Sequence, residues 1–214
     1  MDVELIGAAR RPRLLSADLR LARGLSLIEG PDGQAQGELL RLLALRWPPS
    51  GGVMRVGGED VRGLGPAQRS AYARRVGFAP GDAGLPEYPR VRTALRYLAA
   101  LWQVGGVAKV DAEIERWRLD ARQRLGTLSP GERRRFILAA SLLMSPELWL
   151  LERPFDGLDL PGRTLLRQLL VASAHAEPPR HAVLAQLGEE ADAAKLPVSA
   201  RLWAERGRVH EVPR

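Results

Sequence analysis

The chain has 214 residues, which fits one domain because chains tend to divide only beyond about 250 residues. Hydrophobic residues make up 45% and charged residues 27%, close to the averages of soluble globular proteins, so disordered, collagen-like and coiled-coil chains are excluded. No apolar run reaches the roughly 18 residues of a membrane-spanning helix, and the N-terminal charges follow a short apolar run, the reverse of a secretory signal. With no cysteine, these features predict a cytosolic location without disulfides or thiolate metal sites.

The charge of +7 comes from 32 basic and 25 acidic residues, and every basic residue except Lys109 and Lys195 is arginine. An arginine-rich surface suits phosphate or nucleic acid, because a guanidinium binds phosphate through two hydrogen bonds. The alternative is a GC-rich genome, since Ala, Arg, Gly, Leu and Pro are all frequent. Arginine is spread along the chain and its densest run, 133–135, has three residues, so we favour composition and expect no nucleic-acid partner.

The N-terminal half alternates strands and helices. Its expected elements are the strands Val3–Gly7 and Gly24–Ile28, a glycine turn at 30–33, a helix with apolar residues from Leu39 to Leu45, the strand Val53–Val56, the helix Pro66–Arg75 and the strand Val76–Pro80. A glycine turn thus joins a buried strand directly to a helix.

The C-terminal half continues the alternation. Its expected elements are the helices Val91–Trp102 and Asp111–Trp117, the helix Arg133–Met144 preceded by a capping box from Ser129 to Glu132, the strand 148–151, the helix Pro161–Ala174, the strand Ala182–Ala185 and a hairpin over Val198–Val212 that turns at Arg206 and Gly207. The apolar run 148–151 indicates a strand buried on both faces. Alternating strands and helices predict an α/β fold with a mostly parallel sheet.

Three segments in this order carry a family resemblance. They are Ile28–Gly33 followed by Leu39–Arg41, then Leu128–Arg135, then Pro146–Phe155 followed by Gly157–Asp159. They resemble the phosphate-binding loop, the signature and the Walker B strand with D-loop of the nucleotide-binding domain of an ATP-binding cassette (ABC) transporter. The match runs almost the whole chain. It implies the ABC ATPase form of the P-loop NTPase fold, as a single domain 1–214 with an N-terminal antiparallel β part and a helical subdomain inserted at about 82–145.

The phosphate-binding loop departs from that family. Gly30, Pro31, Asp32 and Gly33 match the loop, but its second glycine is Ala35, and the position of its lysine is Gln36. Gly37 and Glu38 stand where the family has hydroxyl groups that hold Mg²⁺. A carboxylate about 4 Å from a phosphate charge costs about 4 kcal/mol at an effective dielectric of about 20. We therefore expect no nucleotide and no metal in the chain's own site.

The other positions that handle ATP also differ. The strand-end Asp and the catalytic Glu of the family correspond to Glu152 and Arg153, and a guanidinium cannot act as a base. The Q-loop Gln falls on Gly81, and the switch His falls on or beside Leu187. We expect no ATPase activity. A further hypothesis places Glu38 at the helix N-terminus instead of phosphate, paired with Arg153, which alternatively pairs with Glu152.

The signature retains Ser129, Gly131 and Glu132, while Pro130 replaces a glycine and removes one backbone donor. In the family this segment contacts ATP held by the partner domain. ATP is therefore expected only at a composite site formed with a partner. The alternative for Ser129 is a helix cap without further function.

The resemblance favours a non-hydrolysing subunit that pairs with a competent ABC ATPase and a membrane-spanning transporter subunit, peripheral to the cytoplasmic face of the membrane. A homodimer remains open. A second class is a scaffold or regulatory protein that binds no nucleotide, and a third is a basic nucleic-acid binder, which dispersed arginine disfavours. A conventional ATPase ranks last.

Overall fold

The computed structural model describes residues 1–21, 23–104, 106–177, 180–188, 193 and 196–212. Its strands are β1 (Val3–Arg10), β2 (Leu14–Arg20), β3 (Gly24–Glu29), β4 (Gly51–Val56), β5 (Glu59–Asp60), β6 (Val76–Ala79), β7 (Leu148–Glu152), β8 (His181–Ala185), β9 (Val198–Glu205) and β10 (Arg208–Glu211). Its helices are α1 (Gly33–Leu43), α2 (Pro66–Ala73), α3 (Val91–Leu101), α4 (Val107–Arg116), the short 3₁₀ helix η1 (Leu125–Thr127), α5 (Pro130–Leu142) and α6 (Leu160–Ala174).

The described strands form one sheet in the order β5-β4-β1-β2-β10-β9-β3-β8-β7-β6. Strands β9, β3, β8, β7 and β6 pair in parallel, as β10 does with β2, whereas β1 pairs antiparallel with β2 and β4. The predicted α/β fold, with its antiparallel N-terminal part, is confirmed. The expected terminal hairpin is also present, because β9 and β10 pair antiparallel across Arg206 and Gly207.

Strand β7 lies between two hydrophobic clusters. Trp149 and Leu151 belong to the cluster that contains α5 and α6, while Leu148 and Leu150 belong to the cluster that contains α1 and the N-terminal strands. Successive side chains of a strand point to opposite faces, so each face of β7 is covered. The continuous apolar run in the sequence therefore reflects burial on both sides, as predicted.

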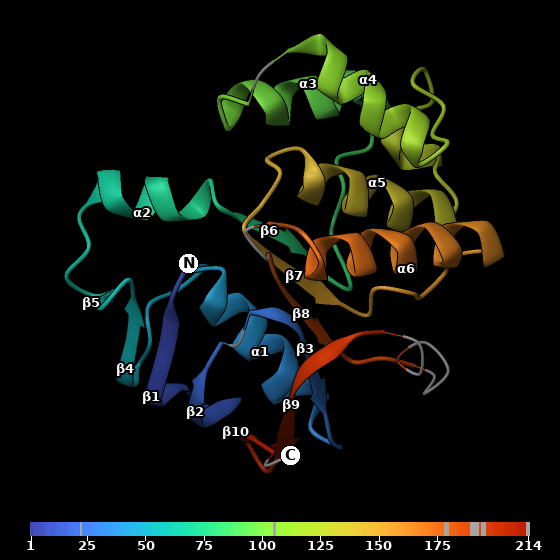
Figure 1. The fold of residues 1–214 in the computed structure, drawn as a ribbon. Helices are drawn as coiled ribbons and strands as arrows, with labels where there is room; N and C mark the ends of the chain where they lie inside the picture. The colour runs from blue at the N-terminus through green and yellow to red at the C-terminus, as the bar shows by residue number, and fades with distance from the viewer. Residues whose placement is uncertain (22, 105, 178–179, 189–192, 194–195, 213–214) are drawn as a thin grey trace.

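Helices α3, α4 and α5 lie together in one lobe, on the opposite side of the molecule from β1, β2 and β10 (Figure 1). All three come from the chain between β6 and β7. Helix α4 begins at Val107, four residues before the predicted start at Asp111. Its first turn is largely exposed, with Val107 at 51%, so no apolar periodicity marks it. None of the described helices is long and apolar enough to cross a bilayer.

Candidate functional site

The carboxyl ends of β3, β7 and β8 meet the beginning of α1, where parallel strands of α/β sheets present their sites. Gly30 leaves β3 with φ of 107°, and a Cβ there would lie 2.3 Å from the Ala204 carbonyl oxygen, so this turn requires glycine. Helix α1 starts at Gly33 with Asp32 as its N-cap. The Asp32 carboxylate accepts from the Ala35 N–H at 2.9 Å and the Gly207 N–H at 2.6 Å.

The hypothesis that Glu38 occupies the N-terminus of this helix is wrong. Asp32 supplies the anion there, while Glu38 lies in the second turn of α1. Its side chain is 8% exposed, and the nearest cation is Arg10, whose Nε is 3.9 Å from Glu38 Oε1. A short polar side chain at the N-cap position satisfies the free N–H groups better than a longer one further along the helix.

Gln36, at the position of the family's lysine, is buried and uses both ends of its amide. Its Nε2 donates to the Gly30 carbonyl at 2.8 Å, and its Oε1 accepts from the Gln186 N–H at 2.8 Å. The side chain thus joins the loop after β3 to the end of β8. A buried amide with both donor and acceptor engaged holds its position, because breaking either bond leaves a polar group unsatisfied.

Glu152, at the end of β7, is the centre of a polar network. Arg41 Nη2 lies 3.3 and 3.2 Å from its two carboxylate oxygens. The Gly81 N–H donates to it at 3.1 Å, and Gln186 Nε2 donates to it at 3.3 Å and to the Gly33 carbonyl at 2.6 Å. We call Arg41, Glu152, Gln186 and Gln36 the α1–β7–β8 network.

This network fills the space beside Gly37, the first hydroxyl position of the loop. A Cβ on Gly37 would lie 2.5 Å from Glu152 Oε1 and 2.8 Å from Arg41 Nη1. Real Cβ atoms do not approach other atoms so closely, so a serine or threonine fits only if Arg41 or Glu152 moves. The cation next to the Glu152 carboxylate is therefore the Arg41 side chain of this same protein.

The prediction that Arg153 pairs with Glu38 or Glu152 is also wrong. Among the described residues, these carboxylates have Arg10 and Arg41 as their ion-pair partners. Arg153 instead lies against Gly81, where an added Cβ would be 2.5 Å from its Nε, and that buried Nε has no hydrogen-bond partner in the described part of the chain. Arg153 has a φ of 48°, in the left-handed region that residues other than glycine seldom adopt.

Leu187, at the switch position, lies next to the network rather than in it. With Gln36 and Gln186 it lines a cavity of about 170 Å³ beside β3. The polar residue here is Gln186, one position earlier, which also has positive φ of 55°. The family's switch position falls on or beside Leu187, and of these neighbours it is Gln186, in the turn that ends β8, whose side chain reaches α1.

The signature segment forms the capping box that the sequence predicts. Ser129 Oγ accepts from the Glu132 N–H at 3.3 Å, and Glu132 Oε2 accepts from the Ser129 N–H at 2.9 Å. The Ser129 backbone and hydroxyl hydrogen bonds lower the pKa of the Glu132 carboxyl. Ser129 remains exposed. A Cβ on Gly131 would lie 2.7 Å from the Gly157 carbonyl oxygen, so this glycine lets the signature helix touch the D-loop.

Arg134, which sequence analysis did not single out, joins the signature helix to the strand ends. It donates to the carbonyls of Pro80, Glu152 and Pro154 at 2.6, 2.7 and 3.3 Å. Only 4% of it is exposed, and burial lowers its pKa to about 10. One of these carbonyls belongs to Glu152, and the other two belong to Pro80 and Pro154, which are the neighbours of Gly81 and Arg153 in the chain. Arg134 thus fixes the backbone of three predicted site positions.

Comparisons with known proteins agree with this architecture. A family profile described as ABC transporter matches residues 16–156. The cytochrome c biogenesis ATP-binding export protein CcmA of Pseudomonas putida is 34% identical over 163 residues, which cover 75% of each chain. The daunorubicin resistance ATP-binding protein DrrA3 of Streptomyces coeruleorubidus is 36% identical over 154 residues, 68% of this chain but 47% of that relative.

Solved structures show the same fold. The dimeric structure of MJ0796, a bacterial ABC transporter cassette, matches with a TM-score of 0.83 at 16% identity, covering 97% of this chain and 96% of that one. The curled mixed sheet, the loop that leads into α1 and the signature helix before β7 together define an ABC ATPase cassette. The chain belongs to the ABC transporter family.

Proposed function

We propose that this chain is a non-hydrolysing ATP-binding-subunit-like component of an ABC transporter, which pairs with a competent ABC ATPase. The observation that carries the proposal is the α1–β7–β8 network. Arg41 takes the place beside Glu152 that a cation would need, and Gln36 spans the loop where the family has a lysine. The residues present do not fit a magnesium-bound triphosphate, so no hydrolytic step is assigned to this chain.

Electrostatics support the same view. A triphosphate entering the loop would meet the buried carboxylates of Glu38 and Glu152, which are 8% and 7% exposed. Gln36 stands at the position of the family's lysine and carries no positive charge. Arg153 cannot act as the base of hydrolysis. Binding would also have to break the hydrogen bonds of Gln36 to Gly30 and Gln186. All of these costs fall on one small site, where the groups share hydrogen bonds.

The role in trans rests on the signature. Ser129 and Gly131 are retained at the start of α5, and Ser129 is exposed, so a partner's nucleotide could reach its hydroxyl. In this arrangement ATP lies in the partner's site and the signature here completes it. Helix N-termini favour anions, which suits a phosphate contact even though Pro130 offers no N–H.

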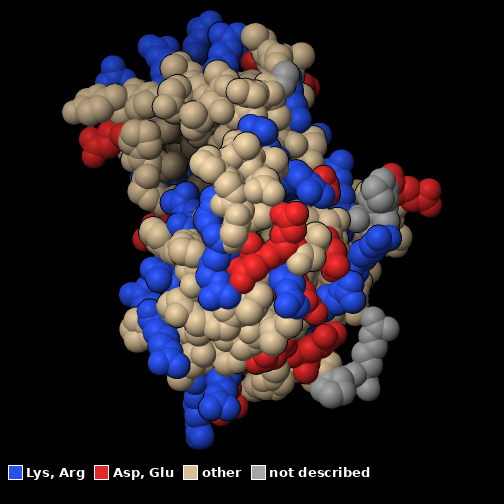
Figure 2. All heavy atoms as spheres, turned by 90° about the vertical axis from the view of Figure 1, so that its left-hand side faces the viewer, with Lys and Arg blue, Asp and Glu red and all other residues tan. Residues whose placement is uncertain are grey.

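The proposed membrane partner would dock on the hollowed side of the molecule. A cavity of about 670 Å³ lies between the end of α1 and α3, with Trp47, Asp82, Leu98 and Trp102 among its lining residues. Figure 2 shows that this side of the molecule is hollowed below its upper lobe. We place the subunit at the cytoplasmic face of the membrane in such a complex.

Two measurements test the proposal. The purified chain should show no binding of a fluorescent ATP analogue with Mg²⁺ up to millimolar concentration, and no phosphate release; binding together with turnover would refute it. Affinity purification from the native cell should bring down an ABC ATPase with intact motifs and a polytopic membrane protein. Replacing Ser129 with Arg should reduce the ATPase rate of that complex, while replacing Arg206 should not.

A scaffold without any nucleotide contact is the second candidate. The observation that favours it is the capping box, because Ser129 and Glu132 already satisfy each other within one helix. In that case the Ser129 replacement would leave the rate of the complex unchanged. On the face shown in Figure 2, Asp and Glu lie among the Lys and Arg, which disfavours a nucleic-acid interface there.

A further inference from the structure

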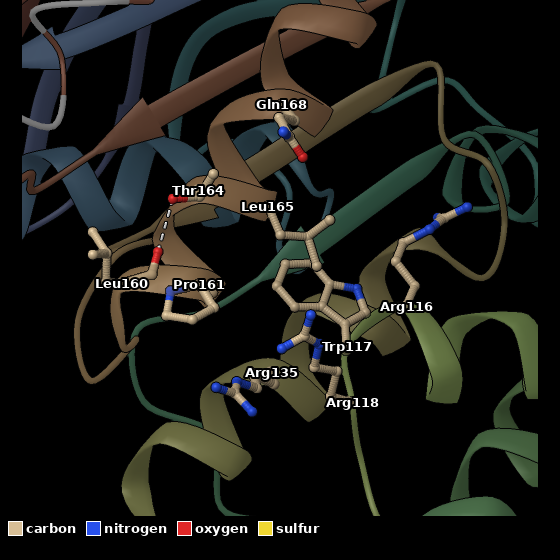
Figure 3. Close-up of a pocket in the computed structure, with 10 residues that line it drawn as sticks. Arg116, Trp117, Arg118, Arg135, Leu160, Pro161, Thr164, Leu165 and Gln168 are labelled. Atoms are coloured by element: carbon tan, nitrogen blue, oxygen red, sulfur yellow. Dashed lines mark hydrogen bonds between the residues drawn. The ribbon is translucent and has the colours of Figure 1, made fainter.

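A groove runs between α4 and α6 on the helical side of the protein. It consists of two adjoining cavities of about 440 Å³ each, which share Arg116. The first lies between the end of α4 and the N-terminal half of α6 (Figure 3). The second follows α4 back to Lys109 and α6 forward to Ala176. We call the two together the α4–α6 groove.

The two walls of the groove differ in chemistry. From Leu160 to Ala176, the residues that line it are apolar, small or neutral polar, and none is charged. Leu165 and Leu169 are partly buried within this stretch. A residue every three or four positions faces the groove, which is the spacing of one helix face. This wall therefore offers apolar contacts along its whole length.

Outside this stretch, the residues that line the groove include cations. They are Lys109, Arg116, Arg118, Arg135 and Arg180. The acidic lining residue of the groove, Glu113, already pairs with Arg116. In Figure 3 the guanidinium groups of Arg118 and Arg135 lie on the same side of the first cavity as Pro161, while Arg116 extends the other way. Arg135 is likewise paired, with the carboxylate of Asp159 at the N-cap of α6. Lys109, Arg118 and Arg180 form no ion pair among the described residues, and they give the groove its net positive charge.

Arg118 stands out among these cations. It has φ of 50°, a left-handed conformation that favours glycine at the end of a helix. It is exposed and forms no ion pair in the described part of the chain. Glycine would serve the helix end with less strain, so the local fold gives no reason for an arginine at this position.

We propose that the α4–α6 groove binds an extended acidic segment of a partner protein that alternates acidic and apolar side chains. In an extended segment, alternate side chains point to opposite sides. One set would face the guanidinium groups and the other the neutral face of α6. The stretch from Leu160 to Ala176 has a length of about 24 Å at 1.5 Å per residue, which about seven extended residues span. A nucleic acid is disfavoured because it would leave the apolar wall without a partner.

This proposal does not depend on the proposed function, since no residue of the phosphate loop lines the groove. It is tested with the full chain and a fluorescein-labelled octapeptide of alternating Glu and Leu, followed by fluorescence anisotropy at low and high salt. The comparison probes are the matching Lys and Leu octapeptide and an eight-nucleotide single-stranded DNA. The variants are Arg118→Gly and Lys109→Gln.

Arg206→Gly is the matched control, because Arg206 also has positive φ, of 49°, and is 90% exposed in the distant hairpin between β9 and β10. We expect the acidic peptide to bind more weakly at high salt, and Arg118→Gly to raise its Kd at least fivefold while the melting temperature stays equal or rises. Lys109→Gln should act in the same direction, and Arg206→Gly should change the Kd less than twofold.

Equal binding of the acidic and basic peptides, or an unchanged Kd in Arg118→Gly, would overturn the proposal. Preferential binding of the oligonucleotide with dependence on Arg118 would also overturn it and assign the groove to nucleic acid. The thermal measurement separates a lost contact from a damaged fold, because the glycine substitution relieves strain instead of adding it.

Discussion

The Arg41 guanidinium lies against the Glu152 carboxylate, with Nη2 3.2 and 3.3 Å from its two oxygens, although 111 residues separate them in the chain. Glu152 is 7% exposed and Arg41 is 31% exposed. A buried carboxylate that loses its cation destabilises the fold. The first prediction therefore concerns the pair of Arg41 and Glu152.

Arg41→Gln should lower the free energy of unfolding by about 2 kcal/mol, since Glu152 stays buried and loses a charged donor. Urea denaturation at pH 7 measures this. Adding Glu152→Gln should recover part of the loss, because no buried charge then remains. The control is Arg20→Gln, which breaks an exposed pair with Asp2 and should leave the free energy of unfolding almost unchanged. Equal costs for both arginines would contradict the assigned role of Arg41.

Arg134→Met should lower the free energy of unfolding by about 3 kcal/mol, at least as much as Arg41→Gln. The reason is that three buried or partly buried carbonyls lose their donor. The same denaturation experiment applies. The neighbouring Arg133→Met is the control, and a change within about 0.5 kcal/mol is expected there. If both variants unfold at the same urea concentration, Arg134 does not hold the strand ends together.

Gly131→Ala should lower the melting temperature by several degrees, because its Cβ would lie 2.7 Å from the Gly157 carbonyl oxygen. For a domain of this size, about 1 kcal/mol corresponds to a shift of about 2–4 °C. Gly84→Ala is the matched control, since a Cβ at Gly84 meets nothing within 4 Å. A lower melting temperature in the control alone would contradict the contact between signature helix and D-loop.

The capping box should make a pH-dependent contribution. The Ser129 hydrogen bonds lower the pKa of Glu132 in the folded chain, so its stabilisation is complete above the unfolded value of 4.5 and is lost as pH falls through the folded value. Glu132→Gln keeps an acceptor but removes the charge. The free energy of unfolding of the wild type should exceed that of this variant by about 0.5 kcal/mol at pH 7, and the difference should shrink as the pH falls below 4.5. A difference independent of pH would contradict the shift.

The signature could be predicted from sequence because its contacts are local. Ser129 and Glu132 are three residues apart and bond within one helical turn, so the spacing alone contains the information. The burial of β7 on both faces could also be predicted from sequence, because the continuous apolar run lies within the strand itself. Strand β2 was missed because its residues, LLSADLR, mix polar and apolar side chains without a clear run.

The α1–β7–β8 network could not be predicted in this way. Gln186 bonds to Gln36 and Gly33, which are 150 and 153 residues earlier, and only the folded sheet brings them together. Family positions directed attention to Arg153 and Leu187. Both Arg153 and Gln186 have positive φ, and single-sequence patterns do not reveal such backbone angles for residues other than glycine.

The location of Arg41 on α1 has one more consequence. A diffusing ion or nucleotide occupies its site in proportion to its concentration, whereas a tethered guanidinium is always present at the same effective molarity. The junction of α1, β7 and β8 therefore holds its cation at all times, whatever the concentration of any diffusing ligand.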